Sequence, residues 1–304
     1  MRQSDGTERT LRPRHVVLAT GISGVPYVPE IPGASDFAGV LCHSSAHISG
    51  RDFAGRRAVV VGSGTSGHDI AQDFYEQGVD VTLVQRSGTY VMSSKNGIAV
   101  LLGGLYEDGG PPVEDADLML SSFTFPVVGQ LHVGATKVLA EMDAELLAGL
   151  EGAGFKLDFG EDGSGLLMKF LTRGGGYYID VGASTLIAES KIKLKQGVGI
   201  ERLERDGVVF TDGTTLPAEV VVLATGYQNM RESARALFGD NVANRYQPVW
   251  GLNSEGELRT VWRRSGQPGL WFMGRQPSTG THLLKVPGPP DQGNRGGLIP
   301  RLET

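Results

Sequence analysis

Three glycines in the sequence have the spacing of a nucleotide-binding turn. Gly62, Gly64 and Gly67 form the pattern G-x-G-x-x-G between a β-branched run, 58–61, and a segment with helical periodicity, 67–77. The first glycine permits a tight turn, the second lets the backbone approach a phosphate, and the third lets the helix pack closely on the strand. The N–H groups and partial positive charge of the helix N-terminus favour a dinucleotide pyrophosphate. Hydroxyl groups that could add donors belong to Ser63, Thr65 and Ser66.

The next strand, predicted at 79–84, ends in residues that favour NADPH. An NAD site places Asp or Glu there to accept from the ribose 2′-OH, whereas this chain has Gln85, Arg86 and Ser87. A guanidinium at Arg86 favours a 2′-phosphate through a charge-assisted contact. The alternative is that Arg86 is a solvated surface residue, and the same two interpretations apply to Lys95.

The order of predicted elements indicates an α/β fold, with a Rossmann-like NADPH-binding domain around a central parallel sheet. Residues 58–84 have the pattern and length of a parallel β-α-β unit. The spacing of apolar residues predicts one amphipathic helix over 138–150 and a short helix over 166–171. Residues 103–134 are predicted as loops and short segments, and residues 1–21 as a hairpin followed by a buried strand.

One hexapeptide occurs twice. Residues 16–21 and 221–226 both read Val-Val-Leu-Ala-Thr-Gly. Two copies 205 positions apart are too few for a solenoid. The repeat predicts the same local structure, a strand that ends at a glycine, at two places in the fold.

Several motifs together resemble the flavin-containing monooxygenases, which use FAD and NADPH. Residues 37–43 look like the F-x-G-x-x-x-H fingerprint of that family, and residues 223–227 are similar to its LATGY signature. The segment 18–21 is similar to the first Ala-Thr-Gly strand of the family. The resemblance covers about residues 14–275. His47 stands where the Baeyer–Villiger fingerprint has Trp-Pro, which argues against that subgroup.

The resemblance implies cofactor contacts and a reaction. FAD contacts are implied at Ala19, Thr20 and Gly21. A hinge next to the cofactors is implied at Thr225, Gly226 and Tyr227. His43 would lie near the nicotinamide cofactor, with a histidine that merely bonds a turn as the alternative. In such enzymes NADPH reduces FAD, and a C4a-peroxyflavin oxygenates a soft nitrogen or sulfur centre of a small molecule. No residue is assigned to catalysis.

The motif order predicts an unequal division of the chain. We expect a remnant of the FAD-binding domain at 1–46, the NADPH-binding domain with a helical insertion at 47–215, and a return to the FAD-binding domain at 216–275. The tail, 276–304, is rich in Pro and Gly and is predicted to be irregular or disordered. Because no glycine motif precedes Leu18, one hypothesis is a fragment or altered reading frame, and the alternative function is a catalytically inert NADPH-binding fragment.

Composition excludes several other classes. The 45 glycines are about twice the usual share but have no three-residue period, so collagen is excluded. The single cysteine, Cys42, rules out a cysteine-based metal site and the redox pair of a disulfide reductase within these 304 residues, and no metal site is expected. A formal net charge of −6 argues against nucleic acid as a partner, and no transmembrane segment or signal peptide is expected. We therefore expect a cytoplasmic protein with a small-molecule substrate.

Overall fold

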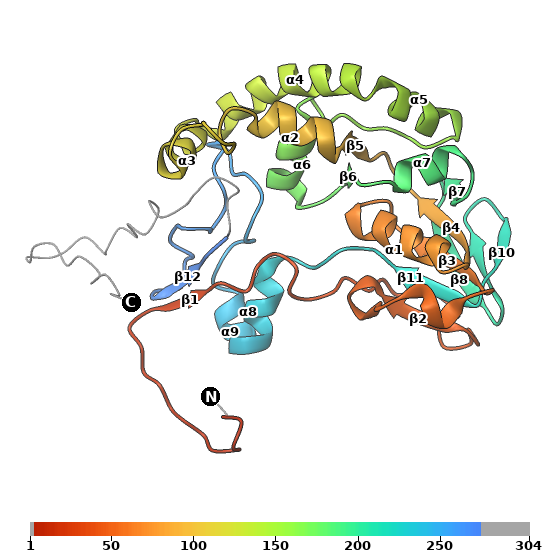
Figure 1. Ribbon diagram of the computed structural model, residues 1–304. Helices are drawn as coiled ribbons and strands as arrows, with labels where there is room; N and C mark the ends of the chain where they lie inside the picture. The colour runs from red at the N-terminus through yellow and green to blue at the C-terminus, as the bar shows by residue number, and fades with distance from the viewer. Residues whose placement is uncertain (1–2, 275–304) are drawn as a thin grey trace, which may run out of the picture.

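Five parallel strands form the central sheet of the computed structural model, which describes residues 3–274 (Figure 1). Their order is β2-β11-β3-β4-β7, so the middle of the sheet is built from segments that are distant in sequence. The strands are β2 (Val40–His43), β11 (Val220–Leu223), β3 (Arg57–Val61), β4 (Asp80–Gln85) and β7 (Lys193–Gln196). Parallel sheets require cover on both faces, and their inner strands are therefore nearly continuous apolar runs, as the Val-rich β3 and β11 are, whereas the edge strand β7 is polar. The predicted α/β fold with a central parallel sheet is confirmed.

A layer of helices covers one face of this sheet. The helices are α1 (Thr65–Glu76), α5 (Ala144–Gly152) and α7 (Ala183–Ala188). Val60, Leu83 and Val222 point into this layer and are fully buried. They alternate along their strands with residues that face the other way, because side chains of a strand point to opposite faces in turn.

A small antiparallel sheet covers the opposite face. It consists of β8 (Ile200–Glu204), β9 (Gly207–Phe210) and β10 (Thr215–Pro217) in the order β10-β9-β8. Val59, Val84 and Val221 of the central sheet pack with Val208 and Phe210 of β9 in one buried cluster. The central sheet is thus the middle of three layers.

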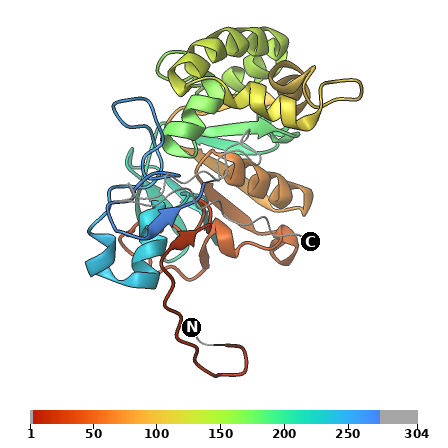
Figure 2. The same ribbon diagram turned by 90° about the vertical axis from the view of Figure 1, so that its left-hand side faces the viewer.

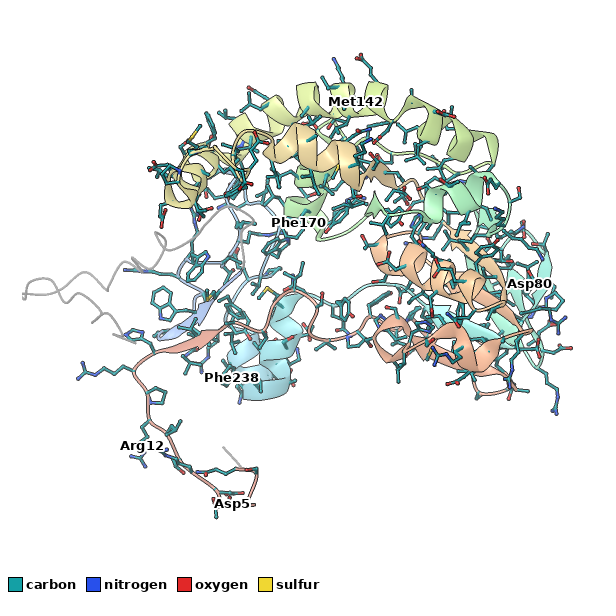
Figure 3. The ribbon with its side chains drawn as sticks, in the orientation of Figure 1. Asp5, Arg12, Asp80, Met142, Phe170 and Phe238 are labelled. Carbon is teal, nitrogen blue, oxygen red and sulfur yellow. The ribbon has the colours of Figure 1, made fainter. Side chains whose placement is uncertain are left out.

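A group of helices and two short strands extends beyond the sheet (Figure 2). Strands β5 (Tyr90–Ser93) and β6 (Tyr177–Asp180) pair in parallel, and β6 begins next to the N-terminus of α1. The helices are α2 (Ser94–Leu102), α3 (Val113–Ser121), α4 (Phe125–Met142) and α6 (Gly165–Arg173). Met142, at the end of α4, lies on the outer surface, half exposed (Figure 3).

A second core lies away from the central sheet. Strands β1 (Val16–Leu18) and β12 (Leu270–Phe272) form a two-stranded parallel sheet that packs with α8 (Met230–Phe238) and α9 (Asp240–Ala243). Phe170 of α6 joins this cluster, so it connects the helical group to the second core (Figure 3). Val17 remains 52% exposed because β1 has β12 as its single strand partner among the residues described.

The helical predictions between residues 103 and 150 are wrong in two respects. The segment predicted as loops contains α3 and most of α4, whose Pro126 lies in the first turn, where a missing N–H does no harm. The single helix predicted over 138–150 is two helices, because Asp143 ends α4 and begins α5. The buried carboxylate of Asp143 accepts hydrogen bonds from the backbone and hydroxyl of Ser93 and from the Asn96 amide. The short helix predicted over 166–171 is confirmed as α6.

The hairpin predicted before β1 lies partly outside the described residues, which begin at Gln3, so it stays a prediction; within them, Gln3 donates its N–H to the Thr7 carbonyl across the turn. Residues 3–14 contain a turn at Asp5–Gly6, and the first strand pairs with β12 rather than with a neighbouring segment. The central sheet extends beyond the predicted 47–215 segment, because β2 and β11 pair with the rest of it on either side of that range. The tail 276–304 lies outside the described residues, and the division into four segments stays a prediction.

Phe74 tests the packing of α1. Its side chain is fully buried and meets the rings of Phe53 and His47 edge-on, at centroid distances of 5.9 and 5.0 Å. We expect Phe74→Ala to lower the free energy of unfolding by about 3–5 kcal/mol, since the cavity cannot collapse fully. The control Leu237→Ala, at a position 61% exposed on α8, should change it by less than about 0.5 kcal/mol. Equal losses in urea unfolding would contradict the packing described.

Candidate functional site

The three glycines of the predicted turn lie between β3 and α1, and each has a different spatial constraint. Gly62 has φ +116°, and a Cβ there would lie 2.3 Å from the carbonyl oxygen of Ala224. A Cβ at Gly67 would lie 1.8 Å from the carbonyl oxygen of Gly62, so close packing of helix on strand requires glycine. Gly64 is open, because the nearest atom to a Cβ there would be the Tyr177 carbonyl oxygen at 3.8 Å. The turn is therefore tight on its inner side and accessible at its middle glycine.

The N-terminus of α1 has no side-chain cap, so its first N–H groups remain available for an anion. The predicted hydroxyl donors differ in position. The Ser63 side chain is buried, and its hydroxyl bonds the Thr89 hydroxyl at 2.7 Å within the fold. The Thr65 hydroxyl donates to the carbonyl of Tyr177 at 3.3 Å. Ser66 is exposed on the first turn of the helix.

Arg86 and Ser87 follow β4 directly and are both exposed. The preceding Gln85 is fully buried, and its carboxamide bonds both the N–H and the carbonyl of Lys156, at 2.8 and 2.9 Å. This pair of bonds fixes the end of β4 against a segment 71 residues away. Arg86 is therefore an exposed residue that directly follows a strand end bonded to a distant segment.

His43 ends β2 and links it to the second Ala-Thr-Gly segment. Its Nδ1 accepts from the backbone N–H of Ser45 at 3.1 Å, so its Nε2 carries the proton and donates to the carbonyl of Gly226 at 2.9 Å. The ring also meets Tyr227 edge-on at 5.3 Å. His43 is thus the last residue of an edge strand of the central sheet.

The two chain segments that connect the central sheet to the second core run side by side. Gly226 accepts from the N–H of Tyr27, and Gln228 donates its N–H to Val25. The hydroxyl of Thr225 donates to the carbonyl of Tyr27 at 2.5 Å. The predicted hinge therefore consists of two hydrogen-bonded segments, and the Gly226 carbonyl also accepts a hydrogen bond from His43.

The structure brings most of the predicted residues together but leaves one group apart. Gly62 abuts Ala224, so the glycine turn and the Ala-Thr-Gly-Tyr segment meet at the carboxyl ends of β3 and β11. Ala19, Thr20 and Gly21 follow β1 and are exposed. Within residues 3–274, no described hydrogen bond or ring contact joins them to the glycine turn.

Sequence reasoning missed His68, which lies in the second turn of α1. Its side chain is fully buried, and Nδ1 lies 3.1 Å from the carbonyl oxygen of Gly64. Burial lowers the pKa of His68 from its ordinary 6.5 to about 4, while the Gly64 carbonyl and the Asp180 carboxylate oppose that change. The signal in the sequence was its position, four residues after the middle glycine, where a helical side chain can reach back to that carbonyl.

Within the described range 3–274, no group of three or more His, Cys, Asp or Glu side chains is placed to hold a metal ion. In that same range, no single helix has the length and hydropathy to cross a membrane, although the bent pair α3 and α4 meets both criteria together.

Several proteins of known sequence are similar to this chain over part of their length. A family profile described as pyridine nucleotide-disulphide oxidoreductase matches residues 5–99, which include the glycine turn. Indole-3-pyruvate monooxygenase YUCCA1 of Oryza sativa subsp. japonica is 32% identical over 225 residues, covering 74% of this chain and 49% of that protein. YUCCA8 of Oryza sativa subsp. indica is 30% identical over 272 residues, covering 85% and 55%. The chain is a relative of the flavin-dependent monooxygenases. It spans about half the length of the relatives it matches.

Solved structures of this class have the same fold. A cyclohexanone monooxygenase with bound ε-caprolactone aligns with a TM-score of 0.53 and 17% identity, over 85% of this chain and 57% of that one. The NADP⁺-bound enzyme from Rhodococcus sp. Phi1 aligns with a TM-score of 0.51 and 16% identity, over 85% and 54%. At this identity the likeness concerns the fold alone.

Gly67 and Gly134 form a matched pair of tests for the turn. We expect Gly67→Ala to lower the free energy of unfolding by about 1–3 kcal/mol, because its Cβ would overlap the Gly62 carbonyl. Gly134→Ala, in open space within α4, should instead raise it by up to about 1 kcal/mol through helix propensity. Urea unfolding of both variants measures the difference, and a harmless Gly67→Ala would contradict the tight inner side of the turn.

The buried His68 predicts an acid-sensitive fold. Above pH 6.5 the imidazole is neutral in both the folded and the unfolded protein, so it does not oppose folding. As the pH falls from 6.5 towards 4, His68 becomes protonated in the unfolded chain but stays neutral in the folded chain. The free energy of unfolding therefore falls by about 3 kcal/mol, at about 1.4 kcal/mol per unit of pKa difference. His68→Phe keeps a ring against Tyr178 but cannot titrate, so it should lose less stability between pH 7 and pH 4.5. Parallel pH profiles for the two proteins would exclude this role.

Proposed function

We propose that this chain carries the NADPH-binding part of an FAD- and NADPH-dependent monooxygenase. The observation that supports this most directly is the uncapped N-terminus of α1 behind a turn in which two glycines have no room for a Cβ. A turn of this shape leaves the backbone N–H groups as the surface that a pyrophosphate meets. The proposed fold is of the Rossmann type.

In the proposed complex, NADPH binds across the carboxyl ends of the central strands. Its pyrophosphate lies on the turn from Gly62 to Gly67, with Ser66 as an available hydroxyl donor. Its 2′-phosphate meets Arg86, with Ser87 beside it. His43 lies at the same edge of the sheet and keeps the Gly226 carbonyl in place, which supports a role at the nicotinamide end.

We further propose that FAD lies between the two cores. Its contacts would come from the two Ala-Thr-Gly segments, namely Ala19, Thr20, Gly21, Thr225, Gly226 and Tyr227. When bound, the flavin supplies the redox and oxygen chemistry, and the chain binds, orients and shields the reactants. The rice relatives are named for indole-3-pyruvate; for this chain we propose a small molecule with a soft nitrogen or sulfur centre.

A catalytically inert NADPH-binding protein is the second candidate. One observation favours it: the two-stranded sheet of β1 and β12 leaves Val17 half exposed, whereas parallel strands are normally covered on both faces. A flavin site built around β1 would rest on a strand whose middle residue is half exposed.

We also propose a cytoplasmic location, supported by the lone cysteine, Cys42, which is unpaired and partly buried.

The two candidates differ in flavin content and turnover. The purified chain should bind FAD, visible as flavin absorbance after desalting, and should then oxidise NADPH with uptake of oxygen. NADPH binding without flavin absorbance or turnover would favour the inert alternative. Absence of NADPH binding in calorimetry would contradict both.

Arg86 tests the choice of dinucleotide. We expect Arg86→Ala to raise the NADPH dissociation constant about 10- to 100-fold, because a charge-assisted contact contributes about 1.5–3 kcal/mol. The NADH dissociation constant should stay within about twofold of its original value, since NADH lacks the 2′-phosphate. Lys95→Ala is the matched cation control, and a selective loss there instead would transfer the phosphate contact from Arg86 to Lys95.

A further inference from the structure

Gly64 is the N-cap of α1, and its carbonyl receives two hydrogen bonds from the same residue. The backbone N–H of His68 and the ring Nδ1 of His68 both lie 3.1 Å from that oxygen. The backbone bond is the ordinary first bond of the helix. The ring bond is additional, and it requires the tautomer with the proton on Nδ1.

The ring of His68 is itself held in place from the other side. It stacks on Tyr178 of β6 with a centroid distance of 4.0 Å and an interplanar angle of 6°. Phe155 approaches it at 5.6 Å. Its Nε2 is buried and has no hydrogen-bond partner among residues 3–274, which is consistent with a neutral ring that donates through Nδ1 alone.

Fixing the Gly64 carbonyl also fixes the N–H of Thr65, because both belong to one planar peptide group. The carbonyl points into the helix, so the N–H points outward from its N-terminus. Glycine is the least restricted residue at such a position, and Gly64 has no side-chain cap of its own. Strand β6 contacts side chains on both sides of this peptide group: the Tyr177 carbonyl accepts from the Thr65 hydroxyl, and the Tyr178 ring stacks on the His68 ring.

We propose that His68 is a positioning residue that keeps the Gly64–Thr65 peptide group in the orientation that binds a dinucleotide pyrophosphate. The inference rests on the proposed NADPH function. It adds that the His68 side chain, which belongs to α1 itself, orients the N–H groups at the N-terminus of that helix without contacting the ligand. It also gives β6 a part in the site although no residue of β6 belongs to the glycine motif.

His68→Asn and His68→Leu test this proposal as a matched pair. Asparagine and leucine have the same branching, but only asparagine can place an N–H where Nδ1 lies. We expect His68→Asn to bind NADPH within about twofold of the original chain, and His68→Leu to bind it about 3- to 10-fold more weakly. The dissociation constants come from calorimetry. Ile70→Val, a mild core change on the same helix, controls for lost stability and should leave NADPH binding unchanged.

Amide hydrogen exchange of the ligand-free proteins supplies a second readout. Residues 62–66 should exchange faster in His68→Leu than in His68→Asn, while exchange in β4 stays the same. Equal binding and equal exchange in the two variants would overturn the proposal, and so would equal losses in both. If the unaltered chain binds no NADPH, the proposed function and the pyrophosphate assignment fail together, and exchange alone then decides whether His68 orders the turn.

Discussion

Backbone atoms of three segments meet at the carboxyl ends of β3 and β11, where no side chain would fit. A Cβ at Gly62 would overlap the carbonyl of Ala224, and a Cβ at Gly67 would overlap the carbonyl of Gly62. This close approach lets α1 begin directly above the sheet and point its N-terminus at the space beyond the strands. The position of the candidate cofactor site depends on it, because a helix further from the sheet would direct its free N–H groups elsewhere.

The same edge of the sheet holds the two connections to the second core. Gly226 lies three residues beyond the end of β11, and its carbonyl accepts from His43 and from the N–H of Tyr27. A single carbonyl therefore ties an edge strand and both connecting segments to one point. Both chain segments that join the central sheet to the second core are therefore paired with each other beside the glycine turn.

Local sequence patterns predicted much of this architecture. The glycine spacing, the β-branched runs and the helix after them were sufficient for the β3-turn-α1-β4 unit, because those features are determined by neighbours in the chain. The end of α4 was misjudged since Asp143 interrupts the helical pattern through bonds to Ser93 and Asn96, about 50 residues away. The Ser63 hydroxyl bonds Thr89 of another segment, a partner that the local sequence pattern does not indicate.

The repeated hexapeptide shows most clearly which features local sequence determines and which depend on tertiary structure. By itself, Val-Val-Leu-Ala-Thr-Gly determined a strand followed by a glycine with positive φ, and both copies have this form, with φ +73° at Gly21 and +80° at Gly226. Tertiary structure alone decided what surrounds each copy. Val222 lies in the middle of the five-stranded sheet with no exposed surface, whereas the equivalent Val17 is 52% exposed on a two-stranded one. Backbone conformation follows from local sterics, but burial depends on which strands, distant in the sequence, pair with each copy on either side.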